Sequence, residues 1–198
     1  MRAVVQRVAS ASVSVDGKVI SSISRGLMVL VGIGTDDTLT DVETLSSKIL
    51  NIRVFDANGA MWKSSVKDIA GEVLCVSQFT LMANTTKGNK PDFHRAMSTN
   101  SSKDLYAVFL EKMRQLYVPD RIQDGEFGAM MNVSLTNEGP VTLTLDTRKF
   151  EYVAVPGGPS RKKSSENGKD KNRRVDVVPS RPSGSVTRGP SHGELDVS

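Results

Sequence analysis

The sequence is poor in the residues on which many catalytic and structural sites depend. Its 198 residues include one cysteine, Cys75, and two histidines, of which only His94 precedes residue 156. One cysteine excludes an internal disulfide and a cysteine-based zinc site, and a single histidine argues against a multi-histidine metal site. We therefore expect neither a metal nor a cofactor.

Long apolar runs are also missing. No stretch approaches the roughly 18 to 20 apolar residues that a membrane-spanning helix needs. Residues 1–7 lack the apolar core and the cleavage site of a secretory signal peptide. These absences predict a cytoplasmic protein without a membrane association.

The positive charge of the chain is unevenly placed. The formal net charge is +4, yet residues 156–198 hold nine basic and five acidic residues, which leaves 17 of each in residues 1–155. The same segment has five of the eight prolines and no aromatic residue, so it cannot bury enough apolar surface to offset the entropy of ordering. We predict a folded domain at residues 1–155 and a disordered, basic tail rich in Ser, Pro and Gly at residues 156–198. The tail is either a dispensable extension or an electrostatic tether for RNA, and composition leaves both open.

Hydrophobic periodicity predicts several short strands and two helices in residues 1–155. The helices are expected at residues 38–50 and 102–117, where apolar residues recur at helical spacing. Asp16-Gly17 and Asn58-Gly59 are typical of hairpin turns. Strands are expected at residues 3–8, 11–15, 19–23, 27–33, 52–55, 60–62, 72–76, 131–135 and 141–145. Because strands and helices do not alternate regularly, we predict an α+β domain with a largely antiparallel, barrel-like β-sheet and two main helices.

Common catalytic constellations are absent from the sequence. Gly32-Ile33-Gly34 lacks the third glycine and the strand–helix context of a phosphate-binding loop. His94 could act as a general base for a serine or threonine, but one histidine provides no orienting partner. A surface or hydrogen-bonded structural role is therefore favoured for it.

Two polar strings lie at the ends of predicted strands. Ser77-Gln78-Phe79-Thr80 follows the strand at residues 72–76 without a turn-forming Gly or Pro, and such polar groups take partners from the backbone or from a ligand. Gly139-Pro140 separates two strand-like runs. It either forms a hairpin turn or presents backbone carbonyls to a ligand at close range. Composition alone favours the structural interpretation of both strings.

Together with other segments, these strings resemble the D-aminoacyl-tRNA deacylase family, also called the D-tyrosyl-tRNA deacylase family. The likeness runs from Met1 to about Leu145, in order and at matching spacing. Asp92 is familiar in animal-type members, whereas bacterial relatives more often have Ser there. The matching strings are AVVQRV at residues 3–8, SQFTL at 77–81, GNKPDF at 88–93, FGA at 127–129 and NEGPVT at 137–142.

The resemblance implies an activity, a partner and a set of site residues. Family members hydrolyse the ester that links a D-amino acid to the terminal ribose of tRNA, and they also clear glycine from mischarged tRNA. They are homodimers in which the partner subunit's Gly-Pro segment completes each active site. The implied catalytic residues are Ser77, Gln78, Phe79 and Thr80; the implied gate against L-residues is a cis Gly139-Pro140 segment, which Arg7 supports.

The hydrolytic step has two interpretations. A Thr80 nucleophile would need an activating base, and the sequence shows none. The resemblance favours assistance by the terminal ribose 2′-hydroxyl of the tRNA, with the N–H groups of Phe79 and Thr80 stabilising the oxyanion. A different class remains as an alternative, namely a non-catalytic nucleic-acid-binding protein that uses the same fold and the basic tail.

Overall fold

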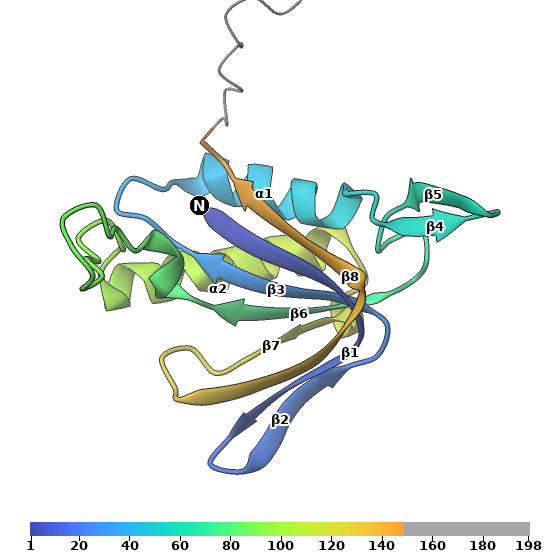
Figure 1. The fold of residues 1–198 in the computed structure, drawn as a ribbon, viewed down its shortest axis with the longest axis horizontal. Coiled ribbons are helices and arrows are strands. Elements are labelled where there is room, and N and C mark those ends of the chain that lie inside the picture. The colour runs from blue at the N-terminus through green and yellow to red at the C-terminus, as the bar shows by residue number, and fades with distance from the viewer. Residues whose placement is uncertain (149–198) are drawn as a thin grey trace, which may run out of the picture. The chain divides into compact units, whose positions relative to one another are not determined.

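The computed structural model describes residues 1–148 (Figure 1). The predicted tail at residues 156–198 and its boundary after residue 155 lie outside the described residues, so this division stays a prediction. Within residues 1–148, no helix is long and apolar enough to cross a membrane.

A curved sheet is organised around the first strand, β1 (Arg2–Val15). One edge of β1 pairs with β3 (Gly26–Gly32) and then with β2 (Lys18–Ile23), and β8 (Met131–Asp146) pairs along its whole length. All three pairings are antiparallel, whereas β6 (Glu72–Ser77) and β7 (Ile122–Asp124) extend the sheet in parallel from β3. The predicted α+β class with a barrel-like sheet and two main helices is confirmed. The parallel pairs and the short β7 were not predicted.

The two helices begin with polar caps and cover one face of the sheet (Figure 1). Thr38 and Asp41 form a capping box at the start of α1 (Leu39–Asn51), close to the predicted helix. The second helix, α2 (Thr99–Leu116), begins three residues before the predicted start, after Ser98. A small hairpin of β4 (Phe55–Ala57) and β5 (Ala60–Ser64) follows α1, and two short 3₁₀ turns, η1 (Phe79–Met82) and η2 (Pro119–Arg121), follow β6 and α2.

Strand β3 is buried on both faces, as its continuous apolar run predicts. Leu27, Val29 and Val31 pack with the helices in the larger core cluster. Met28 packs into a second cluster inside the curve of the sheet, with residues of β1, β2 and β6. The two cores therefore share β3, and this fixes the position of the strand end beside which the candidate site lies.

The Gly139-Pro140 segment is not a hairpin turn, so the interpretation from composition is wrong. Strand β8 continues through it, and its register on β1 shifts between the pairs formed by Gln6 and Val8. Four residues of β8, 138–141, lie opposite the single residue Arg7 of β1 there, which forms a bulge where proline need not donate a ladder hydrogen bond. The side chain of Asn137 closes the bulge by accepting a hydrogen bond from Val141 N at 2.9 Å.

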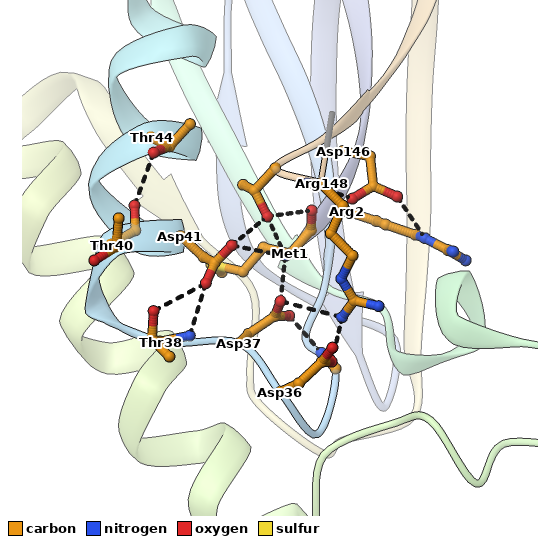
Figure 2. A network of polar contacts seen from close by, with 12 residues as sticks. Met1, Arg2, Asp36, Asp37, Thr38, Thr40, Asp41, Thr44, Asp146 and Arg148 are labelled. Carbon is orange, nitrogen blue, oxygen red and sulfur yellow. Dashed lines mark hydrogen bonds and ion pairs between the residues drawn. The ribbon is translucent and has the colours of Figure 1, made fainter. Parts of the chain in front are cut away.

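A polar network joins the beginning of β1 to the end of β8 (Figure 2). The buried amino group of Met1 contacts the carboxylate of Asp37 and donates to the hydroxyl of Thr147 at 2.6 Å. Asp37 also accepts from Gly34 N at 2.6 Å, and Arg148 pairs with Asp36 and Asp37. The loop before α1 is thereby held against the end of the β1–β8 pair at which Arg2 pairs with Asp146.

Candidate active site

A cavity of about 740 Å³ opens where β3 and β6 end. This volume is within the range of small-molecule sites in proteins. Three of the predicted catalytic residues, Ser77, Gln78 and Phe79, line it, whereas Thr80 does not. The remaining lining comes from the ends of β3 and β6, the beginning of α2 and the start of β8: Val31, Ile33, Val76, Ala96, Met97, Thr99, Ser102, Phe127, Gly128, Ala129, Met130, Met131 and Val133.

The end of β6 determines the position of the predicted catalytic string at residues 77–80. Gln78 N donates to the carbonyl oxygen of Val31 at 2.7 Å, which extends the β3–β6 pairing by one residue. The chain then enters η1, so the first N–H groups of this turn have no partner within it. Phe79 is 59% exposed, and its ring meets that of Phe93 edge-on at 5.1 Å. An aromatic pair thus borders the cavity.

Thr80 has no activating base in the described part of the chain. Its exposed hydroxyl accepts a hydrogen bond from the side-chain amide of Gln78. His94 is occupied elsewhere: its ring contacts Asp92 and its side chain is 90% exposed. Hydrogen bonds from the backbone N–H and then the ring of His94 lower the pKa of the Asp92 carboxyl. His94 is therefore an exposed, hydrogen-bonded residue, the role that the sequence favoured.

The lining of the cavity, within residues 1–148, contains no charged side chain. Its polar groups are the hydroxyls of Ser77, Thr99 and Ser102 and the amide of Gln78. Residues 1–148 also contain no group of three or more His, Cys, Asp or Glu residues that could hold a metal ion. Such a lining can position a polar ligand by hydrogen bonds, but its side chains supply no general base.

The predicted gate residues lie together with Arg7. Arg7 Nε donates to the carbonyl oxygen of Glu138 at 3.0 Å, and Nη1 donates to that of Val54 at 2.6 Å. Gly139 and Pro140 are both exposed, and the peptide bond between them is cis. Gly139 has a φ of +124°, and a Cβ on it would lie 2.9 Å from Arg7 Nη2. The backbone conformation and the closeness of Arg7 both favour glycine here.

The gate residues do not reach the cavity of their own chain. They directly follow Asn137, which pairs with Val8 of β1, so they lie opposite Arg7 of β1. Arg7 in turn pairs with Leu27 of β3. Ser77 pairs instead with Val31, four residues further along β3. At about 3.3 Å per residue, the two levels are roughly 13 Å apart along the strand. One chain therefore holds both predicted groups, but at separate places.

Most of the cavity lining outside the Ser77-Gln78-Phe79 string was not predicted from the sequence. Thr99 and Ser102 come from the first turn of α2, and residues 127–131 come from the segment that leads into β8. Phe127-Gly128-Ala129 was a matching string without an assigned role. Gly128, with a φ of +80°, lies in the left-handed region that glycine adopts readily and that this turn requires.

Comparisons with known proteins find relatives that are about half identical to this chain. A D-aminoacyl-tRNA deacylase from Candida glabrata is 52% identical over 147 residues, which are 74% of this chain and 99% of that protein. The human D-aminoacyl-tRNA deacylase 1 is 53% identical over 148 residues, 74% of this chain and 70% of that protein.

A solved structure titled c-Myc DNA Unwinding Element Binding Protein is 52% identical, with a TM-score of 0.72 over 74% of this chain and 98% of that chain. The model of the D-Tyr-tRNA(Tyr) deacylase family matches residues 4–146. The resemblance found in the sequence is thus confirmed, and the chain belongs to the D-Tyr-tRNA(Tyr) deacylase family.

Proposed function

We propose that this chain hydrolyses the ester of D-aminoacyl-tRNA to free amino acid and tRNA. The observation that carries the proposal is the uncharged cavity bordered by Ser77, Gln78 and Phe79 at the end of β6. Its volume accommodates an aminoacylated ribose, and its hydroxyl and amide groups suit the hydroxyls and the ester of that ligand. Relatives more than 50% identical over nearly their whole length carry the name of this activity.

The hydrolytic step uses a hydroxyl of the substrate. The side chains that line the cavity within residues 1–148 offer no base, and the hydroxyl of Thr80 is hydrogen-bonded only to Gln78 there. The 2′-hydroxyl of the terminal ribose therefore relays the proton as a water oxygen bonds to the ester carbon. The bond from that carbon to the ribose 3′-oxygen breaks, and the proton ends on this oxygen. The N–H groups of Phe79 and Thr80 stabilise the oxyanion that forms in between.

The selection against L-residues comes from a second copy of the chain. The gate of one subunit enters the cavity of its partner, because the two groups lie roughly 13 Å apart along the sheet of one chain. Exposed Gly139 and Pro140 and the apolar side chains at the mouth support this homodimer: Phe79 is 59% and Met130 is 90% exposed. The backbone carbonyls of the gate hold the substrate amino group and exclude an L side chain, whereas a D side chain points outward and glycine passes.

The direct test of the activity is deacylation of D-tyrosyl-tRNA by the purified protein. We expect rapid release of D-tyrosine and no release above background from L-tyrosyl-tRNA. Equal rates on both esters, or no hydrolysis of either, would contradict the proposal.

The two interpretations of the chemical step give opposite results. With 2′-hydroxyl assistance, Thr80→Ala retains near-normal turnover, and a tRNA ending in 2′-deoxyadenosine is cleaved at least about a hundredfold more slowly, the usual lower range for a lost proton relay. A Thr80 nucleophile predicts the reverse pattern. Thr86→Ala, which alters another exposed threonine outside the cavity lining, is the matched control.

The gate is tested by Pro140→Ala. We expect rejection of L-tyrosyl-tRNA to weaken while the D-ester is still cleaved, because the wall against the L side chain is removed. Pro119→Ala changes another exposed proline, in η2, and should leave rejection unchanged. Undiminished rejection in the Pro140 variant would refute the gate. Sedimentation of the purified chain tests the dimer separately.

One observation favours a second function, which is binding to nucleic acid without catalysis. A chain 52% identical to this one is named as a binding protein of a DNA unwinding element. In this chain, the nine basic residues at 156–198 would supply sequence-independent affinity. Truncation after Val155 separates the two functions. Retained deacylation with weaker and less salt-dependent binding makes the tail an accessory, whereas an inactive full-length chain that binds DNA favours the second function.

A further inference from the structure

A loop beside the cavity mouth is anchored at both of its ends. Asn84 and Asp92 pair through two backbone hydrogen bonds of 2.8 and 2.9 Å, which closes a loop at residues 85–91. Phe93 then contacts Phe79 at 5.1 Å, and Ala96 and Met97 line the cavity. Figure 1 shows this green segment beyond the end of β6, away from the β4–β5 hairpin. The base of the loop is therefore fixed at the rim.

Three cations without an ion pair to the described residues lie in and next to this loop. Lys87, Lys90 and Arg95 are exposed and form no ion pair with the described residues. The carboxylate of Asp92 is the only one between residues 83 and 100, and it is already bonded to His94. Residues 1–155 carry no net charge, and the cavity lining within residues 1–148 has no charged residue. This segment of the rim therefore carries a net positive charge directly beside an uncharged cavity.

This distribution fits a ligand with an uncharged end and an anionic chain behind it. We infer that Lys87 and Lys90, assisted by Arg95, bind the backbone phosphates that precede the terminal nucleoside of the tRNA acceptor strand. The inference rests on the proposed function, because it assumes that the terminal aminoacylated ribose occupies the cavity. Lys90 is three residues from Phe93, so its backbone lies within about 10 Å of the rim. From there its ammonium group reaches the first phosphates that emerge from the cavity.

The test compares an ester that carries phosphates with one that does not. Full-length wild-type protein and a Lys87→Ala/Lys90→Ala variant are assayed on D-tyrosyl-tRNA and on 3′-O-D-tyrosyl-adenosine, which has no phosphate. The variant should show a higher KM for the tRNA ester with an unchanged kcat. It should cleave the adenosine ester at the wild-type rate, because these lysines do not line the cavity.

Salt dependence gives a quantitative signature. Each phosphate contact on a single strand contributes about 0.7 to the slope of log affinity against log salt concentration. Loss of two contacts lowers the slope by about 1.4, so between 50 and 200 mM salt the wild-type KM should rise roughly sevenfold more than that of the variant. Lys87→Arg/Lys90→Arg keeps both charges and should restore the wild-type slope.

A matched charge removal elsewhere completes the design. Lys63 and Lys67 are exposed lysines in and after β5, outside the cavity lining, and their double alanine variant should behave as the wild type. The inference is overturned if the Lys87/Lys90 variant keeps the wild-type KM and slope, or if it loses activity equally on the adenosine ester. A wild-type protein that cleaves neither ester overturns the proposed function itself, and this inference with it.

Discussion

Replacing Arg7 should destabilise the fold and weaken the gate together. The guanidinium group is only 13% exposed and donates hydrogen bonds to two carbonyl oxygens, those of Glu138 at 3.0 Å and Val54 at 2.6 Å. A hydrogen bond that involves a charged group contributes about 1.5 to 3 kcal/mol. Arg7 Nε also lies 3.8 Å from Oε2 of Glu138, but that side chain is 34% exposed, so this ion pair adds little. We expect Arg7→Ala to cost about 2 to 3 kcal/mol in total.

Urea denaturation measures this cost. The midpoint should fall at an unchanged m-value, and the Tm should fall by roughly 4 to 12 °C, at about 2 to 4 °C per kcal/mol for a protein of this size. Arg7→Lys should lose about half as much, because an ammonium group can reach one carbonyl but not hold both in a planar fork. A midpoint within error of the wild type, together with intact rejection of L-tyrosyl-tRNA, would refute the reasoning that Arg7 supports the gate.

Three further predictions follow from burial and hydrogen bonding. Burial raises the pKa of the Cys75 thiol to about 12, so a disulfide reagent near pH 8 should label the protein only after unfolding; rapid labelling of the native state would contradict this. Burial tends to raise the pKa of Asp41, but hydrogen bonds from Thr147 and Thr38 outweigh it and lower that pKa below 3.8. The resulting stabilisation is therefore present above about pH 4 and is lost as the pH falls through the folded-state pKa, and Asp41→Asn should flatten acid unfolding over this range. A methyl group at Gly26 would lie 1.8 Å from a carbonyl oxygen of β6, so Gly26→Ala should cost about 3 kcal/mol in urea unfolding, and an unchanged midpoint would disprove the close packing.

The sequence was sufficient to predict those helices and strands in which apolar residues recur with a single period. The predicted helix at residues 38–50 agrees closely with α1, because Val42, Leu45, Ile49 and Leu50 all pack in one core. Strand β1 was divided in two because the exposed Ala9 and Ser10 interrupt its apolar residues. The strand is nevertheless continuous, with Ala3 and Val5 in one core and Ala11 and Val13 in the other. Strand β7 has three residues, too few for any period. The continuity of β1 and the parallel pairing of β3, β6 and β7 depend on partner strands that are distant in the sequence, and the local pattern of residues does not reveal them.

The residues of the candidate site also fall into two groups, those that the sequence pointed to and those that it did not. The string at Ser77, Gln78 and Phe79 could be noticed because polar residues directly follow a buried strand, but only the family resemblance gave it a catalytic role, which stays a prediction. Thr99, Ser102 and Phe127 join them only through tertiary packing, since each is an ordinary residue in its own segment. The separation of Gly139 from the cavity follows from strand register, which the sequence did not determine.

The pairing of β1 with β8 also has a consequence for biosynthesis. Arg2 pairs with Asp146, so the first strand of the described domain waits during synthesis for one of the last parts of that domain. At about 5 to 20 residues per second, this delay is ~7 to 30 s. β3 covers part of one edge of β1 early, but the edge that receives β8 stays open to any other extended chain during that time. Crowded synthesis should therefore expose this domain to mispairing between nascent chains, and a chaperone that shields the open edge of β1 should raise the yield of folded protein.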